Sequence, residues 1–308
     1  MTEDVAAQTP RRRTALVLAL VAITVVVIGA ATAWWLTAGG SEPRATAQRF
    51  LDALVAGDAE ALRVVTDADD DALALFAQAR EHASGAALGA VETDGDDALL
   101  RATVTLGGER AEVAVPMRRL GETWIVQSAT ALTVTPGLGD AFAIGDAAFS
   151  ADEAPRLLPA LYEVAPLPAE VLRGSAEVAI LPGQETAALD LDVAIADDAT
   201  AVVQQHLAEH AADCAAATDA IPDACGIVVP WAADLRALER VAFTVERVPE
   251  VSLDTAAMAF EATGGALVAE VTGTAHDGTA RTFSYRTDDW IMRGALAFRD
   301  AQLVLMVF

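Results

Sequence analysis

The pattern of hydrophobic and polar positions divides the chain into one long apolar run and a series of shorter elements. Residues 14–38 contain no charged side chain, and three arginines at 11–13 precede them directly. The first part of this run, residues 14–36, corresponds to roughly 35 Å of helix, which is enough to cross a hydrocarbon core of about 30 Å. The pattern predicts a transmembrane helix at 14–38 after a short tail at 1–13.

The residues beside this run predict its orientation. Basic residues favour the cytoplasmic side of a span, and tryptophans favour the headgroup level. The expected membrane-interface residues are Arg11, Arg12, Arg13, Trp34 and Trp35. We therefore expect a protein of the cell membrane whose tail is cytoplasmic and whose residues after about 40 are extracytoplasmic. A signal peptide cleaved after the small residues at 31–33 is the alternative, although its apolar region is usually only about 7–15 residues long.

Helical spacing followed by strict alternation describes the next segment, residues 43–134. Apolar residues at 47, 50, 51 and 54 form one stripe of a first helix, and two further helices are expected, the last at 71–82. The alternating segments that follow predict strands, and Gly107-Gly108 marks a hairpin turn between two of them. These strands are expected at 86–92, 98–106, 109–117 and 122–130.

The segment ends in a Gly-x-x-Trp-x-Val sequence formed by Gly121, Trp124 and Val126. Together with the three helices and the meander, this sequence resembles the nuclear-transport-factor-2-like cone over about residues 43–131. Ketosteroid isomerases and many exported lumazine-binding-like domains share that scaffold. The resemblance implies a curved sheet wrapped around a helix, with a pocket at the mouth. It does not imply isomerase chemistry, which needs a tyrosine or protonated aspartate as oxyanion donor, because both tyrosines of the chain lie outside this segment.

Residues 135–308 are expected to form a second exported domain. Residues 187–196 alternate cleanly, a helix is predicted at 199–216, and the rest is mostly strand with turns at Gly264-Gly265 and Asp277-Gly278. The predicted strands are 241–247, 256–262, 266–275, 279–287 and 294–308. The apolar end of the chain is expected to be paired in the sheet. The fold class is therefore α+β: one transmembrane helix, a nuclear-transport-factor-2-like cone and a second, mostly-β domain.

The composition and net charge of the chain limit the kinds of molecule that it can bind. All 20 basic residues are arginines, and no lysine or asparagine is present, which indicates a high-GC bacterial genome of the actinobacterial type. Removing the charges of the first 13 residues leaves 17 arginines against 43 acidic residues, a formal charge of −26. Such a surface repels nucleic acid phosphates. We expect no nucleic acid partner, contact with the lipid bilayer through 14–38, and either an envelope protein partner or a homo-oligomer.

Two groups of residues suggest chemistry. Cys214 and Cys225 are expected to form a disulfide in an oxidising compartment. His206, Glu209 and His210 match the His-x-x-Glu-His arrangement of zinc peptidases, with the histidines one helical turn apart and the glutamate as general base. That family takes a further glutamate ligand from downstream, and residues 271–308 contain none. A solvated helix face is the alternative interpretation.

These observations predict a membrane-anchored envelope protein that acts as a non-enzymatic binding or scaffold module and takes no cofactor. One alternative is an assembly scaffold of the secretion or conjugation type, since those proteins resemble this layout of tail, span and exported domains. The other alternative is a zinc-dependent hydrolase that uses His206, Glu209 and His210.

Overall fold

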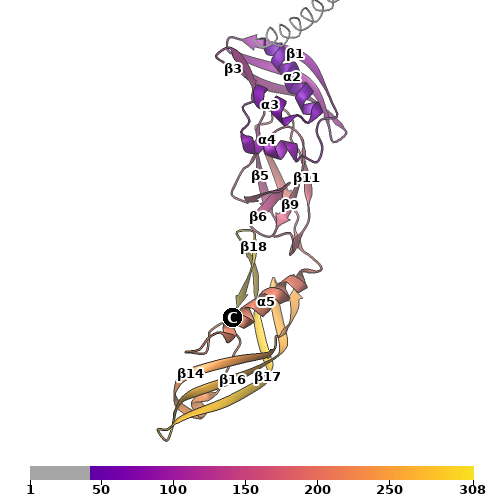
Figure 1. Cartoon of the computed structure of the whole chain (residues 1–308). Helices are drawn as coiled ribbons and strands as arrows, with labels where there is room; N and C mark the ends of the chain where they lie inside the picture. Colours follow the sequence, from indigo (N-terminus) through magenta and orange to yellow (C-terminus); the bar gives the residue numbers. More distant parts are fainter. Residues whose placement is uncertain (1–41) are drawn as a thin grey trace, which may run out of the picture.

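The computed structural model describes residues 42–308, which fold as an elongated, strand-rich α+β molecule (Figure 1). This confirms the predicted α+β class for these residues. The predicted span at 14–38 lies outside the described residues, together with its interface residues Arg11, Arg12, Arg13, Trp34 and Trp35. Within 42–308, no helix combines the length and the hydrophobicity that crossing a bilayer requires.

Three helices open the described part, and short sequence signals set their limits. Helix α2 (Pro43–Ala56) begins with a proline in its first turn and ends at Gly57, whose φ is 66°. The carboxylates of Asp58 and Asp69 accept hydrogen bonds from the first turns of the two helices that follow, at 2.9 and 2.8 Å. Those helices are α3 (Ala59–Val65) and α4 (Asp70–Ala77).

Helix α4 ends five residues before the limit predicted at residue 82. The side chain of Gln78, the residue that ends it, accepts a hydrogen bond from the backbone N–H of Asp146 at 2.7 Å. The ring of His82 returns to the helix end, where its Nε2 lies 2.9 Å from the carbonyl oxygen of Phe76. The long-range contact of Gln78 with Asp146 and the local return of His82 to Phe76 thus replace the last predicted turn.

A four-stranded antiparallel meander follows, and α2 packs across it. The strands come in the predicted order, and both glycines of the Gly107-Gly108 turn have positive φ, as its hairpin requires. Phe50 and Leu54 of α2 and Trp124 of the last strand are buried in the space between helix and sheet. The strands are β1 (Gly85–Asp94), β2 (Asp97–Leu106), β3 (Glu109–Leu120) and β4 (Thr123–Val126).

Two further small sheets extend this core. In one, β5 (Thr130–Pro136) lies between β8 (Arg156–Leu157) and β12 (Thr186–Leu191), and it pairs with β12 in parallel. The other has the order β11-β9-β6-β7. Its strands are β6 (Ala141–Ile144), β7 (Ala147–Ser150), β9 (Leu161–Leu167) and β11 (Ala176–Ala179).

The hydrophobic cores do not divide at the predicted boundary of 134–135. One cluster of buried side chains runs from Ala47 to Leu191 and includes Leu157 and Tyr162 from beyond that boundary. We call this part the first core unit. A two-stranded ribbon, β10 (Leu172–Arg173) with β13 (Ala194–Ile195), leads from it to the rest of the chain.

The second core unit consists of helix α5 (Ala199–Ala215) against a sheet of long antiparallel strands (Figure 1). Leucine, valine and alanine side chains along one face of α5 are buried against the sheet. A short 3-10 turn, η1 (Trp231–Ala233), precedes the sheet. The strands are β14 (Leu235–Arg247), β15 (Glu250–Asp254), β16 (Ala259–Ala275), β17 (Ala280–Arg299) and β18 (Gln302–Val307).

The turn predicted at Gly264-Gly265 is wrong, because β16 runs straight through it. Strands β14 and β15 both pair with β16, and the register shifts around Gly265, opposite the break between them. A Cβ on Gly265 would lie 2.6 Å from the Cγ of Pro249, so the glycine makes room for that proline. The break predicted between 287 and 294 is also absent, because β17 continues with Trp290 and Met292 buried. The Asp277-Gly278 turn is confirmed.

Candidate functional site

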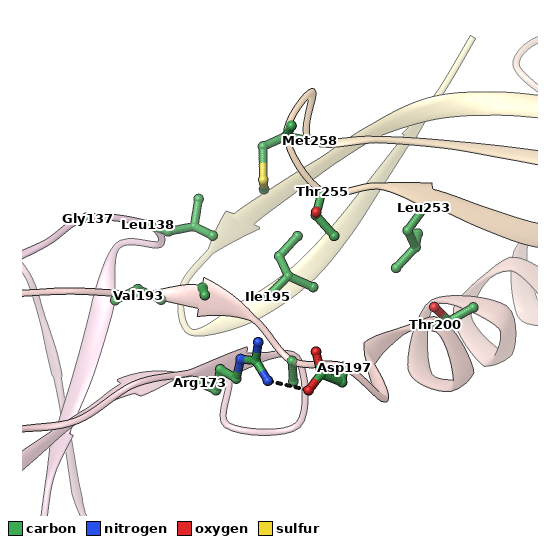
Figure 2. A pocket seen from close by; sticks show the side chains of 13 residues that line it. Gly137, Leu138, Arg173, Val193, Ile195, Asp197, Thr200, Leu253, Thr255 and Met258 are labelled. Atoms are coloured by element: carbon green, nitrogen blue, oxygen red, sulfur yellow. Dashed lines mark hydrogen bonds and ion pairs between the residues drawn. The ribbon is translucent and has the colours of Figure 1, made fainter.

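One hollow in the described residues lies where the two core units meet. We call it the junction cleft, and its volume is about 580 Å³. Its lining comes from the loop after β5, the β10–β13 ribbon, the start of α5 and the turn after β15. Figure 2 shows four apolar side chains around the same space, those of Leu138, Ile195, Leu253 and Met258. The walls of the cleft thus combine these apolar side chains with polar surface.

One ion pair supplies the charge at this cleft. Nη1 of Arg173 lies 2.5 Å from Oδ2 of Asp197, and the two side chains remain 53% and 86% exposed (Figure 2). The hydroxyl groups of Thr200 and Thr255 add neutral polar atoms to the lining. Because Arg173 and Asp197 are the titratable residues that line the cleft and they pair with each other, the arrangement favours binding over proton transfer.

Backbone hydrogen bonds hold the parts of the cleft in place. The N–H of Gly137 donates to the carbonyl of Leu191 at 2.9 Å, and the N–H of Ala196 donates to the carbonyl of Val171 at 2.8 Å. Gly174, next to the ribbon, has a φ of 131°, and a Cβ at this position would lie 2.2 Å from the backbone oxygen of Asp192, just before β13. The ribbon is therefore a fixed wall of the cleft.

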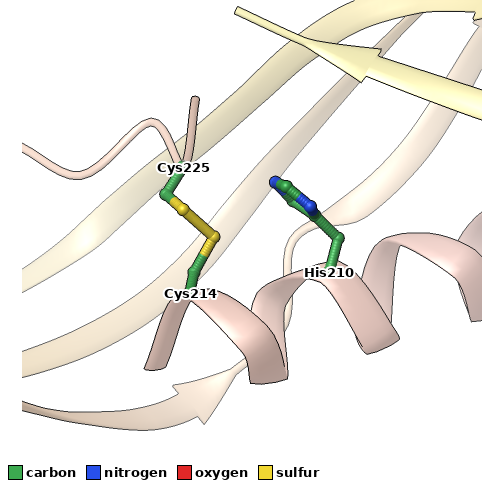
Figure 3. Close-up of side chains that lie close together, drawn as sticks. All are labelled: His210, Cys214 and Cys225. Atoms are coloured by element: carbon green, nitrogen blue, oxygen red, sulfur yellow. A yellow bond between two sulfur atoms is a disulfide. The ribbon is translucent and has the colours of Figure 1, made fainter. Parts of the chain in front are cut away.

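The predicted disulfide is present between Cys214 and Cys225, with their Cα atoms 5.9 Å apart (Figure 3). It joins the last turn of α5 to the loop that precedes η1. His210 stands beside it, and its Nε2 lies 2.9 Å from the carbonyl oxygen of Ala224. His210, Cys214 and Cys225 offer ligand atoms within 4.8 Å of one another. The sulfur atoms bond to each other, so they do not act as thiolate ligands in this state.

The zinc-hydrolase residues are only partly assembled. Helix α5 places His206 and His210 one turn apart, as predicted, but His210 contacts Ala224, and Glu209 accepts a hydrogen bond from Gln205 at 3.2 Å. Within residues 42–308, no group of three potential metal ligands includes His206. The sequence motif thus gains no third ligand in the described part of the chain.

A second hollow of about 460 Å³ lies under residues 226–230, which cross the sheet beside β17. Nε1 of Trp290 donates a hydrogen bond to the carbonyl of Cys225 at 2.8 Å at one end of this segment. At the other end, the hydroxyl of Tyr285 donates to Oδ2 of Asp234 at 2.5 Å. Desolvation, and then the hydrogen bond and negative charge of Asp234, raise the pKa of Tyr285 to about 12.

Sequence reasoning did not identify the junction cleft. Its lining residues are far apart along the chain and carry no motif; Gly137 and Leu138 belong to a segment that the sequence marked only as a linker. Only one local sequence pattern included a residue of the cleft. This is the alternation of residues 187–196, which predicts a strand and ends in ribbon strand β13 with Ile195.

Comparison of the chain with protein-family models, with curated proteins and with solved structures found no match. The resemblance to the nuclear-transport-factor-2-like cone stays a prediction. The function is therefore argued from the geometry of the described residues.

Proposed function

We propose that the chain is a membrane-anchored, extracytoplasmic binding module of the bacterial envelope, without enzymatic activity, and that the junction cleft holds its ligand. The observation that carries the proposal is the cleft itself, a hollow between two core units. It combines apolar side chains with polar groups, and its two charged residues, Arg173 and Asp197, pair with each other. Ligand sites are commonly apolar hollows at such boundaries, with a few polar groups that set orientation. The anchor is the span expected at 14–38.

The lining indicates the chemical class of the ligand. The side chains of Leu138, Leu253 and Met258 suit an apolar body, and the ion pair of Arg173 with Asp197 suits an ionic end group. Arginine binds carboxylates through two parallel hydrogen bonds, and its half-exposed guanidinium can accept such a group beside Asp197. We propose an amphipathic ligand with an acidic end.

The first core unit then acts as a spacer between the membrane and the cleft. Its α2 packs across the meander, with Phe50 and Leu54 fully buried. The order of three helices and an antiparallel meander supports the proposal that this region is a nuclear-transport-factor-2-like cone whose interior is occupied by its own side chains.

A titration with octanoate tests this function, because octanoate combines an apolar tail with a carboxylate. The full chain in detergent micelles, labelled at its methionine methyl groups, is expected to show a saturable shift of the Met258 signal. Met306, which lies outside the cleft, serves as the internal reference. Leu253→Asp places a second carboxylate in the wall and is expected to weaken binding about tenfold or more. Leu120→Asp, at an exposed leucine elsewhere, is the matched control.

The outcomes are distinct. A Met258 shift that saturates in the parent and in Leu120→Asp, but not in Leu253→Asp, supports the cleft as the ligand site. Equal, non-saturating shifts of Met258 and Met306 would show that octanoate only partitions into the micelle, and the proposal would fail.

The assembly-scaffold alternative is favoured by one separate observation: strand β18 ends the sheet with an uncharged, apolar edge. An uncharged strand edge on an acidic protein suits contact with another protein. This edge is independent of the junction cleft.

A further inference from the structure

Strand β18 is paired on one side only. It follows β17 at the end of the sheet order, and the N–H of Phe308 donates to the carbonyl of Arg293 at 3.0 Å. In an antiparallel ladder the residues that bond to the neighbour alternate with residues that do not. The register therefore directs the N–H and C=O groups of Leu303, Leu305 and Val307 away from β17. Within residues 42–308 no backbone group bonds to them from that side.

The free edge also lacks the features that usually prevent strand addition. Residues 301–308 carry no charge and no proline, in a chain of strongly negative charge. Both faces of the strand are apolar: Leu303 is buried toward the α5 core, whereas Met306 is 41% exposed and Phe308 is 80% exposed. Natural edge strands are normally protected by charges, prolines or bulges, and an unprotected apolar edge is a site of strand pairing.

Two other edges of the described sheets carry such protection. Strand β14, at the opposite side of the same sheet, has Arg236, Glu239 and Arg240 and two irregularities of register around them. Strand β1 ends in Glu92 and Asp94. The edge strands β4 and β7 are also uncharged, but each has only 4 residues, whereas β18 has 6.

We propose that the free edge of β18 binds an extended segment of another protein, which adds to the sheet as a further strand. Backbone hydrogen bonds to Leu303, Leu305 and Val307 would provide the affinity, and alternate apolar side chains would cover both faces. The occupant we assign is an apolar segment with arginine or lysine beside it.

The charge of the molecule favours a basic partner. Asp140 and Asp300 stand together at the turn that precedes β18, and Oδ1 of Asp140 is buried without a hydrogen-bond partner in the described residues. A cationic side chain at the end of the added strand that lies beside Gln302 would face this negative charge.

A second copy of the chain is the less suitable occupant. Strand β18 runs along the long axis of the molecule, and its first residue lies toward the first core unit (Figure 1). A symmetric pair of β18 edges would be antiparallel, so it would place the two first core units at opposite ends. Two chains anchored in one membrane through the span expected at 14–38 cannot meet in this way while upright, and each carries a charge of −26 after its tail.

The test uses a synthetic probe peptide of about eight residues, with alternating valine and threonine and an arginine at each end. Its matched control carries N-methyl groups on alternate residues, which removes the donors on one edge. With the full chain in detergent micelles, hydrogen exchange of the Leu303, Leu305 and Val307 amides is expected to slow about tenfold when the probe binds. The methylated peptide is expected to have no effect.

Two variants show where the probe binds. Val304→Lys places a charge on the outer face of β18, and it is expected to abolish the protection. Val228→Lys makes the same change at a valine that is 89% exposed in another part of the second core unit, and it is expected to leave the protection intact. Exchange that stays fast with the probe, or that responds equally to both variants, would overturn the proposal. Protection that appears without the probe and grows with protein concentration would show a second copy on β18, which also overturns it.

Discussion

The backbone N–H of Asp300 donates a hydrogen bond to Oδ2 of Asp140 at 3.0 Å, and this contact joins the β17–β18 turn to the first core unit. Both residues of that turn, Asp300 and Ala301, have positive φ, so the turn is a tight hairpin held in one orientation. The contact connects two regions that lie 160 residues apart. It thus helps to fix the position of the second core unit against the junction.

Removing the carboxylate of Asp140 should loosen this contact. We predict that Asp140→Ala lowers the free energy of unfolding by about 1 kcal/mol, the usual net value of one hydrogen bond. Hydrogen exchange of the Asp300 amide should become faster in the variant and should stay unchanged in Asp152→Ala, a control at an exposed aspartate of the first core unit. Equal exchange at Asp300 in the parent and in Asp140→Ala would contradict the role of the contact.

The disulfide should stabilise the second core unit. Cys214 and Cys225 are 11 residues apart, and closing a loop of this size restricts the unfolded chain. Replacing both cysteines by serine is expected to lower the free energy of unfolding by roughly 3 kcal/mol. Urea denaturation of the two proteins measures the difference, and adding a reductant should lower the stability of the parent alone. If the free energy of unfolding of the parent protein is the same with and without reductant, this expectation is refuted.

Trp290 should contribute through its indole N–H as well as its burial. Trp290→Phe leaves the carbonyl of Cys225 without its donor in a buried place, which costs about 1–3 kcal/mol. The denaturant midpoint should fall accordingly. A matched change, Trp231→Phe, affects a half-exposed indole and should shift the midpoint far less. Similar shifts of the midpoint in both variants would mean that the hydrogen bond to Cys225 does not contribute measurably to stability.

Tyr285 should make the stability depend on alkaline pH. Its pKa is raised to about 12 in the folded protein, whereas an unfolded tyrosine has a pKa of about 10. The unfolded chain therefore releases this proton first, so the contribution is complete below about pH 10 and is lost as the pH rises toward 12. Asp234→Asn should lower the pKa of Tyr285, measured from the absorbance of tyrosinate.

Tyr162 provides the internal comparison for that titration. Burial raises the pKa of its phenol above the ordinary range, and its hydroxyl donates a hydrogen bond to the carbonyl of Leu158 at 2.8 Å. We expect Tyr162 to titrate only when the first core unit unfolds. A tyrosinate signal from both residues near pH 10 in the folded protein would contradict these environments.

Local patterns were sufficient for much of the fold. The meander β1–β4, helix α5 and the disulfide follow from alternation, helical spacing and cysteine count. The Gly107-Gly108 and Gly264-Gly265 pairs show the limit of this reasoning, because both carry the same local signal and only the first is a turn. The difference comes from Pro249, which lies against Gly265 from the break between β14 and β15, and the residues around Gly265 do not reveal this contact.

Non-local pairing explains what the sequence left open. Strand β5 pairs in parallel with β12, which lies more than fifty residues later in the chain. Because of this pairing, the first hydrophobic core includes residues on both sides of the domain boundary predicted at 134–135. The junction cleft depends on the same long-range assembly, since Leu138, Ile195 and Met258 meet only after both core units form. The site motif that sequence did offer, His206 with Glu209 and His210, lies elsewhere on α5.

The central claim is that the junction cleft holds a ligand while the chain is anchored outside the cytoplasm. The most direct measurement places a photocrosslinking side chain at Thr255, an exposed cleft residue, in the full chain in its native membrane. Mass spectrometry of the irradiated protein is expected to find one defined amphipathic adduct at Thr255, which is absent in Leu253→Asp and absent when the crosslinker is at the exposed Thr135. No adduct at Thr255, or the same adducts at Thr135, would contradict the account.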